Sequence, residues 1–191
     1  MTLKPRLRRL VLTAHVTFAV GWLGAVAAFL VLAIAGLTSQ DAQTVQSVYI
    51  SMDLIARYVI LPLSFAPLLL TGPLLSLATP WGLFRHYWIL VKLLINILST
   101  FILVQHMQPI DALAVAAKTT GINANFRGMQ DEMVIASVAA LLALLVATAL
   151  AVIKPRGMTS YGWRKQEEER TARTESGVVV GKDVATQAST D

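Results

Sequence analysis

The chain contains four long runs of apolar residues, separated by shorter polar stretches. The runs cover about 10–37, 54–78, 87–107 and 133–153. A helix needs about 20 residues to cross roughly 30 Å of hydrocarbon, and each run reaches that length. The pattern therefore predicts an all-α protein, a four-helix transmembrane bundle whose connectors lie outside the membrane.

The third run carries polar residues along one side of its predicted helix. Counted from Arg85, they fall at offsets 0, 7, 11, 14 and 21, which share one helix face. Ionisable groups within a bilayer are costly and usually point into a protein interior or a wet cavity. Function is therefore expected along this polar stripe, which consists of Arg85, Lys92, Asn96, Ser99 and His106.

Composition supports the membrane assignment and gives an orientation. The chain is 55% hydrophobic and only 14% charged. Most of its 16 Lys and Arg residues lie before the first run, between the second and third, or after the fourth, whereas the opposite side has only Lys118 and Arg127. Lys and Arg concentrate in cytoplasmic segments, so both termini are predicted to be cytoplasmic. The net charge of +5 follows from this topology and does not indicate nucleic-acid binding.

The runs divide the chain into three regions. A basic cytoplasmic N-terminus (1–9) precedes the membrane domain (10–154), and a charged tail (155–191) follows. The tail is predicted to be disordered, with a helical stretch near 163–173, because it cannot bury enough apolar surface to fold alone. The first run exceeds the 7–15 apolar residues of a signal peptide, which favours an uncleaved span.

The connectors and the second run hold most of the residues that break helices. Polar connectors are expected at 38–52 and 108–132, the latter with a short helix at 110–118 that ends before Gly121. The second run contains Pro62, Pro67 and Pro73. Proline removes a backbone hydrogen bond, so this run is either a kinked packing helix or a locally opened backbone that lines a site.

Depth along the helices divides the polar residues into two groups. At about 1.5 Å per residue, His15 and Lys92 each lie roughly 10 Å from the cytoplasmic boundary, on spans that run in the same direction. His106 lies about 21 Å beyond Lys92, near the outer surface. We therefore predict an inner group of His15 and Lys92, with Trp22 on the same face as His15. An outer polar cluster is predicted from Arg57, His106, Asp53, Asp131 and Glu132.

Both groups also have structural interpretations. His15 is either a hydrogen-bonded packing residue or a ligand, and Lys92 is either a site residue or a cation that reaches toward headgroups. Asn96 and Ser99 suit interhelical hydrogen bonds. Arg57 and Asp53 form an interfacial ion pair in the simplest interpretation of the outer polar cluster.

The inner group can also support cofactor chemistry. A histidine within a helix bundle can serve as an axial ligand of haem iron, and Lys92 can offset the charge of a haem propionate. The chain has no cysteine, so any haem is noncovalent, that is, haem b. A two-histidine metal site is less favoured, because His15 and His106 lie at opposite depths and no histidine pair has ligand spacing.

Two resemblances bear on this chemistry. The stretch 79–92, with Trp88 four residues before Lys92 and His106 further along, resembles a bacterial family of small four-span membrane proteins known only as a domain of unknown function. More distantly, His15, Trp22 and Gly24, followed by Lys92 and His106, are similar to HemJ-type protoporphyrinogen oxidases and to CopD-type membrane proteins. Both resemblances imply a location in the bacterial inner membrane. The similarity to the HemJ type also implies that His15 binds haem. The Arg and Tyr-His that typically follow the tryptophan in the HemJ type are replaced here by residues 25–32.

The sequence therefore leaves three functions open. The first is haem b binding or support of membrane redox chemistry. The second is a noncatalytic membrane partner or assembly factor that uses its tail as a contact surface. The third is a small transporter or metal-homeostasis component, which with four spans requires a homo-oligomer. Whether the protein is an enzyme is left open.

Overall fold

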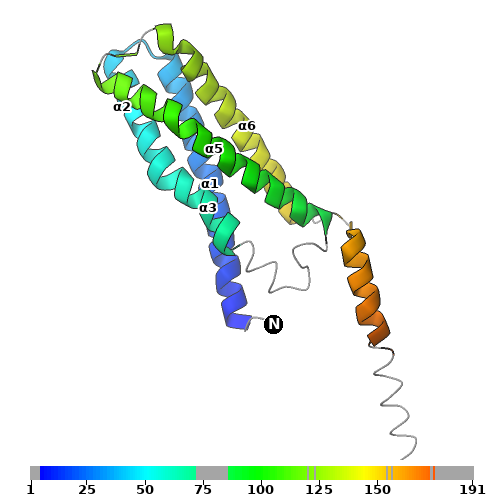
Figure 1. Ribbon diagram of the computed structural model, residues 1–191. Helices are drawn as coiled ribbons and strands as arrows, with labels where there is room; N and C mark the ends of the chain where they lie inside the picture. The colour runs from blue at the N-terminus through cyan, green and yellow to red at the C-terminus, as the bar shows by residue number, and fades with distance from the viewer. Residues whose placement is uncertain are drawn as a thin grey trace, which may run out of the picture.

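The computed structural model describes residues 5–71, 86–119, 121–122, 124–153, 155, 157–172 and 174, and these form helices and short connections. The first long helix is α1 (Pro5–Thr38). The second is continuous through α2 (Ala42–Ile55), η1 (Ala56–Ile60), α3 (Leu61–Phe65) and η2 (Ala66–Thr71). The third is α5 (Tyr87–Thr119), and the fourth is α6 (Arg127–Ile153), preceded by η3 (Ala124–Phe126). A last helix covers 160–172 (Figure 1).

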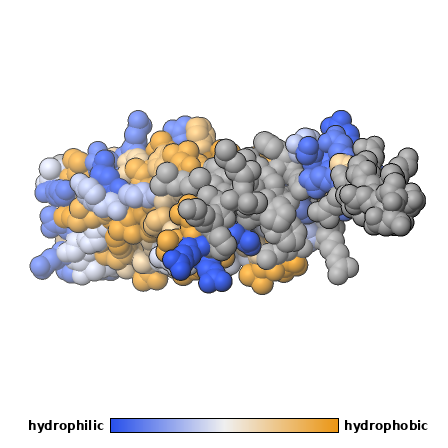
Figure 2. Space-filling view, turned by 90° about the horizontal axis from the view of Figure 1, so that it is seen from below, coloured by the Kyte–Doolittle hydropathy of each residue, from blue (hydrophilic) through white to orange (hydrophobic). Residues whose placement is uncertain are grey.

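Four of these helices are long and apolar enough to cross a membrane, as the apolar runs predict. They are α1, the continuous second helix, α5 and α6, and each leaves large apolar side chains exposed, among them Val31, Tyr58, Phe101 and Ile135. Apolar side chains cover much of the visible bundle surface in Figure 2. Lipid can solvate such a surface at little cost, whereas water cannot.

The four helices form a ring in which each packs against two neighbours. α1 packs against α6 and the second helix, and α5 packs against the same two, so α1 and α5 lie diagonally opposite. Short loops after α1 and after α5 lie at one end of the bundle, which we call the connector end. The start of α1 and the end of α6 lie at the other end, the terminal end (Figure 1).

The helices at the connector end begin earlier and end later than the apolar runs indicate. α2 starts at Ala42, so most of the predicted 38–52 connector is helical, and the Asp41 carboxylate caps it by accepting a 2.8 Å hydrogen bond from Thr44 N. α5 continues through Pro109 to Thr119, so the predicted short helix at 110–118 is the last part of the third helix. Gly121, at a φ of 76°, follows the end of α5 and donates a 2.8 Å hydrogen bond to Ala116 O.

The second helix continues through Pro62 and Pro67 without interruption. η1 and η2 are π-helical segments, and in η1 the Leu61 N–H bonds the Ala56 carbonyl five residues earlier. Pro62 and Pro67 follow or fall within these segments, where the wider turn accommodates a residue without an N–H. The described part of this helix is thus continuous through Pro62 and Pro67; Pro73 lies outside the described residues.

The hydrophobic core lies mainly toward the connector end. α1 buries one stripe at spacings of three and four residues, and this stripe shares one core cluster with buried residues of the second helix, α5 and α6. Tyr49 is 1% exposed and its hydroxyl accepts a 2.8 Å hydrogen bond from Gln130 Nε2 on α6. A side chain at Gly36 would meet Tyr49 at 2.8 Å, so this glycine permits the contact between α1 and α2. The α1 stripe consists of Trp22, Val26, Phe29 and Ala33.

The terminal-end half is packed much less tightly. Within the described residues, α1 buries no side chain between 6 and 21, and α5 buries none between 87 and 99. The ribbon of α5 also diverges from α1 and α3 in this half (Figure 1). The candidate residues of the inner group lie here.

Candidate functional site

His15 and Lys92 lie at the same level of the terminal-end half, on the two diagonally opposed helices. Both side chains are partly buried. α1 and α5 are not principal packing partners, so the two side chains belong to helices that face each other across the bundle. The structure therefore places both residues of the predicted inner group in the same half of the bundle.

Lys92 also makes a contact within its own helix. Its Nζ lies over the ring of Trp88, 5.9 Å from the ring centroid, in a cation–π arrangement. Trp88 is one turn nearer the terminal end, so the ammonium group points toward that end of the bundle. The ring of Trp88 is in turn 6.5 Å from that of His86. Trp88 and His86 thus extend the inner group, and the spacing of four between Trp88 and Lys92 is the signal that predicts their contact.

Trp22 lies between the inner group and the hydrophobic core. It lies two turns beyond His15 on the same face of α1, and only 3% of it is exposed. It belongs to the hydrophobic core with Val26 and Phe29. Trp22 therefore forms the boundary between the packed half and the half that holds His15.

The middle of the polar stripe lies between the inner group and the connector end. Asn96 and Ser99 are half-buried, while Arg85, its first member, lies outside the described residues. Thr100, beside the stripe, is 4% exposed and its buried Oγ1 has no hydrogen-bond partner within the described part of the chain. Sequence reasoning missed Thr100, since a threonine in an apolar helix is not by itself a signal.

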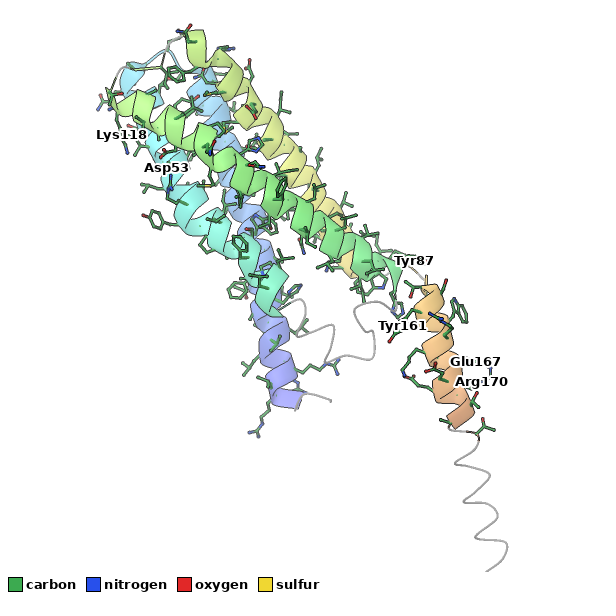
Figure 3. All side chains as sticks on the ribbon, in the orientation of Figure 1. Asp53, Tyr87, Lys118, Tyr161, Glu167 and Arg170 are labelled. Atoms are coloured by element: carbon green, nitrogen blue, oxygen red, sulfur yellow. The ribbon has the colours of Figure 1, made fainter. Side chains whose placement is uncertain are left out.

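Arg57 forms an ion pair with two carboxylates on the side of the bundle where the second helix meets α5. Its guanidinium group lies 3.0 Å from Asp53 and 3.1 Å from Asp111. Asp53 lies toward the connector end of the second helix (Figure 3). Asp111 was not predicted as a partner, because the sequence placed it in a connector rather than on α5.

His106 instead faces α6. Its Nε2 lies 3.3 Å from Glu132 Oε1, and its Nδ1 lies 2.8 Å from the carbonyl oxygen of Ile102. Asp131, next to Glu132, pairs with Arg127 at 3.7 Å. His106 and Asp111 are five residues apart and so point about 140° apart around α5. The predicted outer polar cluster is thus arranged as separate ion pairs on different flanks of α5, and Arg57 does not contact His106.

The segment after α6 is fixed to the start of α5. His86 and Met158 form an isolated backbone bridge, and Tyr87 N donates a 3.3 Å hydrogen bond to Gly157 O. Figure 3 shows Tyr87 and Tyr161 at this junction. Tyr161 and Trp163 are 51% and 62% exposed, so the helix over 160–172 begins beside the inner group and leaves its aromatic side chains uncovered.

The chemistry of these residues limits what they can bind. Among the described residues, no group of three or more His, Cys, Asp or Glu side chains is arranged to hold a metal ion. A cofactor that brings most of its own ligands needs only one imidazole from the protein, and His15 can supply that. Of the outer ion pairs, Arg57–Asp111 joins the second helix to α5 and His106–Glu132 joins α5 to α6, whereas Arg127–Asp131 lies within α6.

No known protein family, curated protein or solved structure matches the chain. The arguments that follow therefore rest on the chain's own residues.

Proposed function

We propose that this protein is an integral protein of the bacterial inner membrane that binds haem b in the terminal-end half of the bundle, with His15 as the iron ligand. The observation that carries the proposal is that partly buried His15 and Lys92 both lie in the loosely packed half, on diagonally opposite helices. Polar residues at such a position within a span are costly unless they serve a site.

The proposed orientation has both termini in the cytoplasm. Arg6, Arg8 and Arg9 begin α1 at the terminal end, and the helix over 160–172 adds further basic residues there. At the connector end, the described basic side chains are Arg57 and Arg127, which are paired with carboxylates, and Lys118. The excess of unpaired Lys and Arg is therefore at the terminal end, which is the cytoplasmic side by the positive-inside rule.

The residues of the inner group fit the demands of a haem. Porphyrin nitrogens supply four iron ligands, so the protein would need to supply only one imidazole, which His15 could provide. The Lys92 ammonium group, held toward the terminal end over Trp88, is placed to pair with a propionate. Trp22, two turns from His15, is buried in the core and would limit the site on the core side. A membrane-embedded haem needs these three things: a ligand, a counter-charge and an apolar wall.

The bound haem would supply one-electron transfer. The protein's own residues would have separate tasks. His15 would hold the iron between α1 and α5, Lys92 would orient the macrocycle through its charge, and the packed core beyond Trp22 would exclude water from the connector side. Of these, only His15 touches the iron.

An absorption spectrum tests this proposal. The detergent-purified protein, reconstituted with haem b and passed through gel filtration, should carry a Soret band, and His15→Ala should remove it. The chain offers matched controls in its other two histidines, since His86→Ala and His106→Ala should retain the band. A wild-type protein that never retains haem would overturn the proposal, as would a His15→Ala protein with an unchanged band.

The exposed helix over 160–172 favours a second candidate function, that of a noncatalytic membrane partner. The helix is anchored to the start of α5 by the bridge at Met158, yet residues 163–172 are all exposed. It has basic and acidic side chains in similar number, so it suits a partner with mixed charge. Reversing Glu167, Glu168 and Glu169 to Lys should then weaken a cross-linked complex in cells without changing a Soret band. A complex unaffected by this reversal would argue against the helix as the contact surface.

A further inference from the structure

An open groove lies at the connector end, on the exposed flank of α2 where this helix packs beside α1. Its volume is about 470 Å³, which is within the range of small-molecule sites. Leu32 of α1 forms one wall, and the other wall consists of side chains from Asp41 to Ser51. We call it the α1–α2 groove.

The polar side chains of the groove offer hydrogen-bond acceptors. The Thr44 hydroxyl donates to the Asp41 carboxylate, and those of Ser47 and Ser51 donate to backbone carbonyls one turn earlier, at 2.9 and 2.7 Å. A hydroxyl has one hydrogen, so these three groups present only lone pairs to the groove, and an ionised carboxylate also only accepts. A ligand must therefore supply the hydrogens.

Asp41 gives the groove a negative charge. The hydroxyl and the backbone N–H of Thr44 both donate to its carboxylate and hold the pKa of Asp41 below its ordinary value. No Lys or Arg is among the residues that line the groove. A cation that carries several N–H donors matches both the charge and the acceptors, and a primary ammonium group is such a cation.

The groove crosses the boundary between hydrocarbon and headgroups. Leu32 belongs to the first apolar run, whereas Asp41 follows the end of that run. Below Leu32, Ala28 and Gly24 are exposed on the same face of α1, and nothing lies within 4 Å of a side chain built at Gly24. These small residues leave space beside α1 for an acyl chain.

We propose that the α1–α2 groove binds phosphatidylethanolamine. The lipid ammonium group bonds Asp41 and the hydroxyl oxygens of Ser47 and Ser51, and an acyl chain runs along α1 past Leu32. The Gln43 side-chain amide, also part of the lining, can donate to the lipid phosphate. This site lies at the opposite end of the bundle from the inner group, so it is independent of haem binding.

The acceptors and the charge together distinguish phosphatidylethanolamine from other headgroups. Phosphatidylcholine carries the same charge, but its quaternary ammonium group has no N–H and leaves the acceptors unpaired. Phosphatidylglycerol is anionic and has no cation to pair with Asp41, so the carboxylate repels it. The groove should therefore prefer the ethanolamine lipid to the choline lipid, and the choline lipid to the glycerol lipid.

Native mass spectrometry of the full-length protein tests this order. The protein is offered an equimolar mixture of the three lipids with identical acyl chains, and the ethanolamine lipid should be retained in excess. Asp41→Asn still caps α2 but removes the charge, and should lower the ratio of bound ethanolamine lipid to glycerol lipid by a factor of about 2–5. Ser47→Lys supplies an ammonium group from the chain itself and should lower the ratio as well. The matched control Asp53→Asn removes a carboxylate of the same helix outside the groove and should leave the ratio unchanged.

Three results would overturn the proposal. The first is equal retention of the three lipids by the wild type, and the second is an equal fall of the ratio in Asp41→Asn and Asp53→Asn. The third is retention of soluble glycerophosphoethanolamine as strong as that of the lipid at the same concentration, which would assign the groove to a free ammonium compound. Asp41 and Ser47 are exposed and lie outside the core, so each variant tests the groove without loss of a buried contact.

Discussion

The two halves of the bundle differ in what their interior residues do. Toward the connector end, side chains such as Tyr49, Leu113 and Met133 are almost fully buried and polar groups find partners within the protein. Toward the terminal end, α1 and α5 bury no described side chain, and the polar residues His15 and Lys92 are only partly buried. Close packing stabilises a protein, but a cofactor site requires space that side chains leave unfilled. We infer from this difference that the connector-end half stabilises the fold, whereas the terminal-end half is available for a functional site.

The largest expected effect tests whether stability resides in the connector-end half. Leu113→Ala removes a fully buried side chain and should lower the free energy of unfolding in mixed micelles by about 2–5 kcal/mol. Leu93→Ala on the same helix removes a half-buried side chain in the other half and should cost about 1 kcal/mol or less. Equal losses in the haem-free protein would contradict the division.

A pair of glycines on α1 tests the same comparison at the helix contact. An added methyl group at Gly36 meets Tyr49 at 2.8 Å, so Gly36→Ala should destabilise the protein by about 1–3 kcal/mol. Gly24 has nothing within 4 Å, and Gly24→Ala should be neutral or slightly stabilising. Thermal unfolding of both variants checks this, and a tolerated Gly36→Ala would show that the α1–α2 contact is looser than described.

The account of the inner group predicts a smaller effect at Lys92. Lys92→Met keeps the apolar stem but removes the charge, and should weaken haem binding by a factor of about 2–5, as expected for a partly exposed ion pair. Lys92→Arg should restore the affinity, because it restores the cation. A haem titration monitored by absorbance measures both. Unchanged affinity in Lys92→Met would assign Lys92 to lipid headgroups instead.

The smallest effect concerns the cap of α2, outside the spans. The hydrogen bonds from Thr44 hold the pKa of the Asp41 carboxyl below its ordinary value. A carboxyl with a lowered folded-state pKa stabilises the fold above its unfolded-state pKa, and this contribution disappears as pH falls through the folded-state value. Stability should therefore decline in acid, and Asp41→Asn, which still caps, should remove this part of the decline. An identical acid response in Asp41→Asn would exclude the cap as its source.

Much of the fold was predictable, since apolar runs of this length report directly on membrane helices. The four helices follow them, and the place of His15 and Lys92 in the same half of the bundle follows from counting residues along two spans of the same direction. The helix ends were not predictable from hydropathy. The polar residues of α2 and the stretch of α5 after Pro109 read as connectors, yet they are helical because they pack on one another beyond the apolar runs.

The outer polar residues show a second limit of sequence reasoning. Depth along a helix places Arg57 and His106 at one level, but the direction around α5 separates their partners. Asp111 turns toward the second helix and His106 toward α6. The order of helices around the bundle decides these pairings, and that order is a property of the tertiary structure that hydropathy does not contain.

The central claim is that the imidazole of His15 holds haem iron in the loosely packed half. His15→Gly, reconstituted with haem and passed through gel filtration with and without free imidazole, tests it most directly. The account predicts that the variant loses protein-bound haem, that imidazole restores the Soret band, and that the unfolding free energy of the haem-free protein is unchanged. A His15→Gly protein that binds haem as the wild type does, or that imidazole cannot restore, would contradict it.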